Sequence, residues 1–479
     1  MSQSNVWTHK GTFILAAVGS AVGLGNLWRF PYMIGENGGG AFILVYALTV
    51  LFVGIPILMA ETLIGRSGRK SPILAMTELT KSHNTSPAWQ VIGWMGALAA
   101  LLILSFYSVI AGWSVHFGLV EFSGRLSGAD AASIGAVFSG LLDNPLLLML
   151  YHTIFMLASA VIVGLGIHKG LEKGLRILMP LLFVMLLMIL AYGVVFGEIG
   201  QAASYLFSFK LSELSLQGWL AAMGQAFFSL SLGLGAIMAY GAYMPSRESI
   251  SRSAITIAIA DTGVAIIAGL AIFSLVFAAG QETAAGPGLM FVTLPIAFAD
   301  IPFGSLFGGL FFILVFVAAL SSSISLIEPV AAYLVERFSL SRMQAVGAMA
   351  FVAWLLGILT VLSFNLWAES SVFHALFGKS AFDSIDFLAS NILLPLGGVL
   401  IALFAGWALT REEVQRELGT NPTWYSLWQI SVRYVAPVAV LYIFIRGIGL
   451  VSGDIWPLII ALGFMLSFVG GRSLWLKNS

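Results

Sequence analysis

The stretch GSAVGLGNLWRFPY, residues 19–32, interrupts an apolar segment with three glycines, an asparagine, an arginine and a proline. Glycine and proline both weaken the interior of a helix. Inside a lipid bilayer every backbone N–H and C=O group needs a partner, so a helix is broken at membrane depth only where its backbone lines a protein cavity. The stretch therefore predicts a discontinuous membrane helix whose freed backbone groups face an internal site.

The composition indicates an integral membrane protein. Of 479 residues, 59% are hydrophobic and only 9% are charged, whereas about a quarter of the residues in a soluble domain carry charge. Basic and acidic residues balance at 22 each, and no nucleic acid partner is expected. Cysteine is absent, which excludes disulfides and thiolate metal sites.

Apolar runs of about 20 residues recur along the chain, which is the length that crosses the hydrocarbon core as a helix. Most of the basic residues fall in connections on the side of the N-terminus, so the positive-inside rule predicts cytoplasmic N- and C-termini and a place in the cell's inner (plasma) membrane. We expect an all-α membrane protein with twelve transmembrane helices. The predicted spans are 11–36, 40–66, 88–120, 146–167, 170–196, 216–244, 253–280, 304–335, 343–364, 382–409, 429–449 and 454–473.

The interrupted pattern occurs twice. AVGLGNL at 21–27 and LSLGLGAI at 230–237 both place a G-L-G core inside an apolar span. The two spans are five apart, and an odd offset reverses the orientation, so they predict an inverted repeat with discontinuous helices 1 and 6. The expected division is 1–200 for the first repeat, 201–412 for the second and 413–479 for two further spans, all acting as a single domain. The alternative is that these glycines only permit close helix packing.

Ionisable residues inside the predicted spans are few and include Arg29, Glu61, Asp261 and Glu328. Each costs about 2.5 to 3.5 kcal/mol at mid-bilayer, so an internal partner and a functional role are the default expectation. Together with two broken helices, they indicate a polar site at membrane depth.

Oxygen atoms dominate the candidate ligands. Asn26, Asp261 and Ser229 carry amide, carboxylate and hydroxyl oxygens. The stretch ALSSSISLIEP places Ser321, Ser325 and Glu328 on one helix face, with Ser322 beside them. Such ligands favour a hard cation over zinc. The alternative for the serines is hydrogen bonding to the preceding helical turn.

These segments carry a resemblance to a known family. GSAVGLGNLWRFPYMIGENGGGAF, FFSLSLGLGAIMAYGAY, the serine run before EP, and SIDF at 384–387 resemble bacterial members of the neurotransmitter:sodium symporter family. The resemblance covers nearly the whole chain. It implies the leucine-transporter-like fold, a 5+5 inverted repeat with discontinuous helices 1 and 6.

The resemblance implies two sodium sites and one amino acid site. The first sodium site would use the Ala21 carbonyl, Asn26, Ser229 and Asp261. The second would use the carbonyls of Gly19, Val22 and Ala318 and the hydroxyls of Ser321 and Ser322. The amino acid carboxylate would lie on the amides around Leu24 and Gly25, near the Tyr107 hydroxyl. The implied substrate-binding residues are Ala21, Gly23, Leu24, Gly25, Tyr107, Phe228, Ser229, Ser231, Leu234, Ser322 and Leu326.

The resemblance also implies gates and one structural acid. Arg29 and Asp386 would form an outer ion pair above the aromatic lid, and Glu61 would hold the unwound segments by hydrogen bonds. Gly170 and Pro180 match an element whose unwinding opens a water path to the second sodium ion, although an ordinary proline kink is the alternative. The implied gating residues are Trp7, Arg29, Tyr107, Gly170, Pro180, Phe228, Tyr243, Glu336 and Asp386.

Three departures from the family pattern bear on mechanism. Asp261 replaces an asparagine, and Ala265 stands where a glutamate follows one turn later, so Asp261 is expected to supply the negative charge and chloride is not expected. Ser4 stands where the family has an inner-gate arginine. Gly23 leaves no carboxylate for a monoamine, which favours an amino acid.

The resulting expectation is a sodium-coupled symporter, not an enzyme, that imports a neutral, hydrophobic L-amino acid by alternating access. Two sodium ions are expected, the bilayer is the surrounding partner, and a monomer is expected to suffice, with a dimer left open. The alternatives are a transporter-like amino acid receptor or sensor and a cation channel, although channel filters are usually built from rings of repeated loops.

Overall fold

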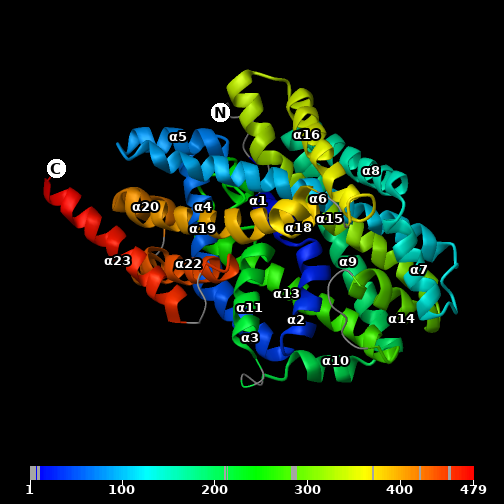
Figure 1. Ribbon diagram of the computed structural model, residues 1–479. Helices are drawn as coiled ribbons and strands as arrows, with labels where there is room; N and C mark the ends of the chain where they lie inside the picture. Colours follow the sequence, from blue (N-terminus) through cyan, green and yellow to red (C-terminus); the bar gives the residue numbers. More distant parts are fainter. Residues whose placement is uncertain are drawn as a thin grey trace.

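A computed structural model describes residues 7, 11–209, 212, 214–281, 288–368, 372–419, 422–450 and 455–478 (Figure 1). All the regular structure in these residues is helical. The first half comprises α1 (Thr12–Ala21), η2 (Gly25–Arg29), α2 (Phe30–Glu36), α3 (Gly40–Thr49), η3 (Val50–Gly54), α4 (Ile55–Gly68), α5 (Pro72–Ser82), η4 (Pro87–Gln90), α6 (Val91–Phe122), α7 (Ala131–Leu142), α8 (Pro145–Gly164), η5 (Ile167–Glu172), α9 (Lys173–Phe196) and α10 (Ile199–Leu206).

The second half continues the same pattern of long apolar helices and short connecting helices. It comprises α11 (Leu216–Ser229), α12 (Ala236–Ala242), α13 (Ile250–Ala278), η7 (Leu289–Thr293), α14 (Leu294–Asp300), α15 (Gly304–Phe338), α16 (Arg342–Ser363), α17 (Val372–Phe377), α18 (Ala381–Asp386), η8 (Phe387–Leu393), α19 (Leu394–Leu403), η9 (Phe404–Ala408), α20 (Arg411–Leu418), α21 (Pro422–Ile430), η10 (Ser431–Val435), α22 (Ala436–Gly447) and α23 (Ile455–Asn478).

Nine helices of the described residues are long and apolar enough to cross a membrane, and a bent pair makes a tenth. The pair is Thr12–Ala21 and Gly25–Glu36, which meet at 47°. The short helices α11 and α12 form the corresponding pair at the sixth predicted span, and α23 follows as the last. The predicted all-α fold and the order of its spans are therefore confirmed.

Both predicted breaks are present, and local backbone preferences explain them. α1 ends at Ala21 because Val22 is extended, at φ −74° and ψ 110°. Between α11 and α12, Ser231, Gly233 and Gly235 have φ values of 54°, 81° and 72°. Only glycine adopts such values without strain, so Ser231 is the unusual member. Its hydroxyl donates to the Ser20 carbonyl at 2.9 Å, which ties the second break to the first.

The broken helices lie at the centre of the molecule. In the most apolar stretch of α15, 83% of the residues are buried inside the protein, and in that of the span Pro87–Phe122, 78% are buried. The corresponding share is only 39% in α8 and in the span Ile167–Phe196. A helix with so much exposed apolar surface faces lipid. Figure 1 shows α5 near one end of the molecule and α10 near the other. The interior that α1, α6 and α15 share is where a membrane-depth site can lie.

Candidate functional site

A small cavity of about 30 Å³ lies between the two breaks. All the substrate-binding residues implied by the resemblance line it, except Ser229. Ligand pockets usually measure a few hundred Å³ or more, so an amino acid can enter only if side chains around the cavity move. The lining residues that were not predicted are Ser20, Ile103 and Leu394, and Ser325, a candidate oxygen ligand, also lines the cavity.

The first cluster of oxygen atoms surrounds the carboxylate of Asp261. Asn26 donates from Nδ2 to Oδ1 at 2.8 Å, Ser229 donates from Oγ to Oδ2 at 2.6 Å, and Tyr46 donates from its hydroxyl to Oδ2 at 3.1 Å. All four side chains are fully buried or nearly so. Tyr46 was not predicted. In the sequence, Tyr46 stands out only as a tyrosine inside an apolar span. Its hydrogen bond to Asp261 joins positions 215 residues apart.

The second cluster joins α1 to the middle of α15. The Ser322 hydroxyl lies 3.2 Å from the Val22 carbonyl and 3.4 Å from that of Gly19. The Ser321 hydroxyl lies 3.4 Å from the Val22 carbonyl and 2.9 Å from that of Ala318. Carbonyl and hydroxyl oxygens suit a hard monovalent cation, so this donor set fits sodium. The bond from Ser321 to Ala318 is a hydrogen bond to the preceding helical turn. Such bonding was the alternative to a ligand role for the serines.

Gly23 and Gly25 let neighbouring side chains approach the backbone that lines the cavity. A Cβ atom at Gly23 would lie 2.3 Å from the Ser322 hydroxyl, and one at Gly25 would lie 3.2 Å from the Phe228 ring. The Leu24 amide points to the Tyr107 hydroxyl at 3.4 Å. These glycines therefore lie at the helix break and also permit close packing, which was the alternative explanation for them.

The comparisons with known proteins agree with this geometry. A sequence model described as "Sodium:neurotransmitter symporter family" matches residues 4–134 and 137–454. The chain belongs to this family. A sodium-dependent transporter of Bacillus subtilis is 35% identical over 93% of this chain and 98% of its own length, and one from Haemophilus influenzae is 33% identical over 93% and 98%. Neither of these two relatives has been characterised further.

A solved structure extends the comparison to three dimensions. The crystal structure of MhsT in complex with L-phenylalanine superposes with a TM-score of 0.84 at 43% sequence identity, covering 92% of this chain and 99% of MhsT. Members of the family are sodium-coupled transporters, not enzymes. The protein is therefore a multi-pass membrane transporter with the leucine-transporter-like fold.

On the side of the molecule that carries Trp7, aromatic rings and a buried ion pair are linked through Tyr243. Trp7 is buried, and its ring lies 5.8 Å from those of both Tyr240 and Tyr243. The Tyr243 hydroxyl donates to Glu328 at 2.7 Å, and Arg342 forms an ion pair with the same carboxylate. Glu328 was expected to have an internal partner, but Tyr240 and Arg342 were not predicted here.

Glu336, one of the implied gating residues, contacts the start of α5. Its Oε2 accepts a hydrogen bond from the Ser71 amide at 2.8 Å, which links the end of α15 to the start of α5. Ser4, the departure from the family pattern, lies outside the described residues.

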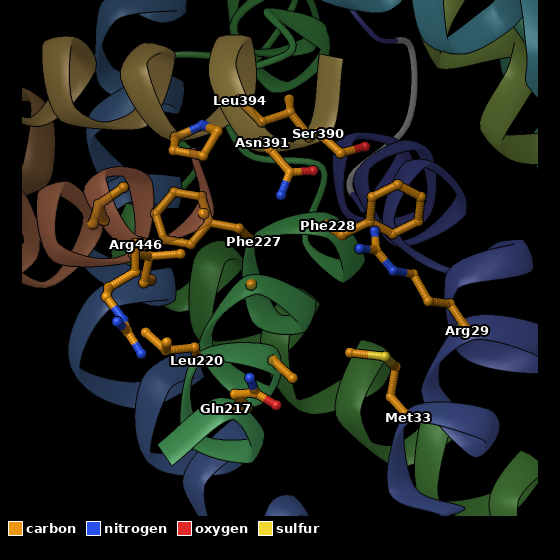
Figure 2. A pocket seen from close by; sticks show the side chains of 16 residues that line it. Arg29, Met33, Gln217, Leu220, Phe227, Phe228, Ser390, Asn391, Leu394 and Arg446 are labelled. Atoms are coloured by element: carbon orange, nitrogen blue, oxygen red, sulfur yellow. The ribbon is translucent and has the colours of Figure 1, made fainter. Parts of the chain in front are cut away.

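On the opposite side, a cavity of about 480 Å³ lies above Phe228. Figure 2 shows Arg29 reaching across the Phe228 ring, and the guanidinium carbon lies 4.4 Å from the ring centroid. Asp386 accepts a hydrogen bond from Ser390 at 2.7 Å. No ion pair joins Arg29 to Asp386 in the part of the chain that the structure describes, so the expected contact is absent in this conformation and a cation–π contact takes its place.

Two buried polar side chains hold the unwound segments. Glu61 accepts a hydrogen bond from the Gly233 amide at 3.2 Å, as predicted for the break near α12. Gln225, which was not predicted, donates to the Gly25 carbonyl at 3.0 Å. Glu61 therefore provides an acceptor for a backbone amide of the second break. Gln225 adds a second hydrogen bond to the Gly25 carbonyl, which also accepts from the Phe30 amide.

The Gly170–Pro180 segment is helical in this conformation. It begins in η5, and Pro180 lies inside α9 without ending it. A Cβ atom at Gly170 would lie 2.0 Å from the Ile162 carbonyl, so glycine is required here for close packing on α8. Leu175 and Met179 face Gly19 of the second oxygen cluster. The predicted unwinding is not seen in this conformation and stays a prediction.

Proposed function

We propose that this transporter imports a neutral, hydrophobic L-amino acid together with sodium by alternating access. The observation that carries the proposal is the position of the central cavity, between two helix breaks and beside two oxygen clusters. The breaks offer free carbonyls for a cation and free amides for a carboxylate. MhsT, 43% identical, was crystallised with L-phenylalanine, which supports this substrate class.

Two sodium ions per cycle fit the two clusters. In the proposed first site, sodium takes oxygens of Ala21, Asn26, Ser229 and Asp261. In the proposed second site, it takes the oxygens that the hydroxyls of Ser321 and Ser322 approach in this structure. Sodium favours the outward-open state only to the extent that it binds that state more tightly.

Chloride is not required in this proposal. The carboxylate of Asp261 accepts from three buried donors, and so it supplies a fixed negative charge beside the first site. An anion added next to it would meet like charge.

A hydrophobic substrate is favoured by the cavity wall. Leu234, Leu326, Ile103 and Leu394 are apolar, and none of the described residues that line the cavity is charged. A charged substrate side chain would be buried there without a partner, which is strongly unfavourable. Phe228 lines both this cavity and the larger one, so its movement would admit the substrate.

We further propose that the transporter lies in the plasma (inner) membrane with both termini in the cytoplasm. The structure then corresponds to an outward-facing state, because Trp7 closes the N-terminal side while the 480 Å³ cavity lies opposite. One chain supplies every residue of the clusters and the cavity, so a monomer is expected to suffice.

Counterflow in proteoliposomes tests the proposal. Vesicles loaded with unlabelled L-phenylalanine should accumulate external labelled L-phenylalanine in sodium but not in potassium. Binding without exchange would instead indicate a receptor or sensor. A sodium conductance that persists without amino acid and does not saturate would indicate a channel.

A further inference from the structure

A stripe of basic side chains covers the start of α9. Lys169 lies in η5, and Lys173 and Arg176 lie in the first turns of α9. Their spacing of four and three residues places them on one helix face. All three are exposed, and the ion pairs found among the described residues involve none of them. The stripe is therefore a set of cations without an acidic partner in the part of the chain that the structure describes.

The same face of α9 continues as an exposed apolar surface. Ile177, Leu181 and Val184 are 56%, 42% and 55% exposed, and they continue the spacing of Lys173 toward the middle of the span. Positive charge followed by apolar surface along one face matches the shape of a phospholipid, whose anionic headgroup leads into an acyl chain.

A second helix repeats this arrangement. Arg252 is exposed in the first turn of α13, and Ile255 and Ile259 are exposed three and seven residues later. α9 and α13 pack together near their far ends, where a Cβ atom at Gly193 would lie 3.4 Å from the Ala271 carbonyl.

The two groups of cations lie at similar distances along their helices from this contact. Counting back along α9 from Gly193 to Lys173, and along α13 from Ala271 to Arg252, covers about 30 Å in each case at 1.5 Å per residue. The hydrocarbon core of a bilayer is about as thick. The start of α9 lies beside the start of α1, where Thr12 donates to Glu172, so a place at the membrane boundary on that side fits both distances.

We infer that the stripe binds an anionic phospholipid, with its phosphate on Lys173 and Arg176 and an acyl chain along Ile177, Leu181 and Val184. Clusters of basic residues next to a span attract anionic headgroups. The positive-inside rule explains cations on this side, but it does not require unpaired cations that share a face with an apolar stripe. The inference goes beyond the proposed function and rests on its orientation and its outward-facing assignment.

The position of the site gives the lipid a mechanical consequence. The stripe lies on the Gly170–Pro180 segment, whose other face packs on α1. There Glu172 accepts a hydrogen bond from Thr12 at 3.2 Å, and Leu175 faces Gly19. A lipid that holds Lys173 and Arg176 at the membrane boundary keeps this segment helical and against α1, which stabilises the outward-facing state.

Lipid binding is tested with the full chain and dioleoylphosphatidylglycerol as the probe, by native mass spectrometry from detergent. The variant Lys173→Gln/Arg176→Gln is compared with Lys81→Gln/Arg337→Gln, which removes two exposed cations elsewhere on the same side. The first variant should bind about 30-fold more weakly, equivalent to about 2 kcal/mol, and the control should match the wild type. Equal weakening in both variants, or none in either, would overturn the assigned site. Competition by inorganic phosphate alone would show that no acyl chain is needed and would also overturn it.

A second measurement does not depend on any variant. Hydrogen exchange of peptides covering 167–180 is followed in nanodiscs of phosphatidylcholine with and without phosphatidylglycerol. Slower exchange with the anionic lipid is expected, and exchange that ignores the lipid would contradict the stabilising effect. Neither readout requires transport, so failure here is distinct from failure of the proposed function, which counterflow tests.

Discussion

Ser229 donates its hydroxyl to the Asp261 carboxylate across 2.6 Å, and this bond links the end of α11 to the middle of α13. The first helix break approaches the same carboxylate through Asn26. The break that ends α11 and the break that follows α1 are thus joined by one buried acid. A cation placed among these oxygens would bind both breaks at once, which is how sodium could organise the site before the amino acid arrives.

Replacing Asp261 should disable sodium-dependent binding. Asp261→Ala removes the carboxylate that accepts from Asn26, Ser229 and Tyr46, and each hydrogen bond to a charged group is worth about 1.5–3 kcal/mol. Labelled L-phenylalanine binding in sodium should weaken at least about tenfold. Scintillation proximity binding on purified protein measures this, and unchanged affinity would contradict the first sodium site.

The charge of Asp261 should also make chloride unnecessary. Wild-type binding is expected to be equal in sodium chloride and sodium gluconate. Asp261→Asn keeps the shape of the side chain without its charge, so binding by this variant should weaken and recover in part when chloride is present. A wild-type protein that needs chloride would overturn this part of the account.

The second oxygen cluster offers a matched pair of substitutions one residue apart. Ser322→Ala removes a hydroxyl that faces the Gly19 and Val22 carbonyls, whereas Ser323→Ala removes one that contacts Ser159. The sodium concentration that gives half-maximal L-phenylalanine binding should rise about tenfold for Ser322→Ala, from loss of one ligand. Ser323→Ala should stay close to the wild type. Equal shifts would mean that the serines only stabilise α15.

Gly23 should not tolerate a methyl group. Gly23→Ala places a Cβ atom 2.3 Å from the Ser322 hydroxyl, and overpacking of this kind costs about 1–3 kcal/mol. L-phenylalanine affinity should fall accordingly by isothermal titration calorimetry. Gly135→Ala is the control, because nothing lies within 4 Å of its Cβ position. Full affinity in Gly23→Ala would show that the cavity wall is not set by this close approach.

Breaking the Glu328–Arg342 pair should open the N-terminal side. Arg342→Gln leaves a fully buried carboxylate without its cation, and breaking a buried pair costs about 3–5 kcal/mol. The chain has no native cysteine, so Ser20→Cys in the central cavity reports access cleanly. Its reaction with an impermeant maleimide from the N-terminal side should be faster in Arg342→Gln and unchanged in Arg337→Gln, an exposed arginine nearby. Equal rates in all three backgrounds would remove the pair from the gate.

The sequence predicted those features that depend on local preference. The break at 230–235 follows from Gly233 and Gly235, which adopt positive φ. The break at 22–25 follows from glycines that weaken the helix. Most lining residues of the central cavity follow from the resemblance. Tyr46, Gln225 and Arg342 could not be found in this way, because each reaches a partner through the fold rather than along the chain.

The expected Arg29–Asp386 pair shows a second limit of sequence reasoning. Both residues stand where the resemblance implies, but the direction of each side chain depends on its neighbours. Arg29 lies over Phe228 and Asp386 accepts from Ser390. A gate that closes around substrate is a property of another conformation, which residue identity alone does not specify.

The central claim is that the two helix breaks bind the amino acid and sodium together. An electron density map of the protein prepared with sodium and L-phenylalanine tests it most directly. The account predicts the amino acid between residues 22–25 and 230–235, with its carboxylate toward the amides near Leu24 and cation density in both oxygen clusters. Amino acid density confined to the cavity above Phe228, or continuous helices through both segments, would contradict it.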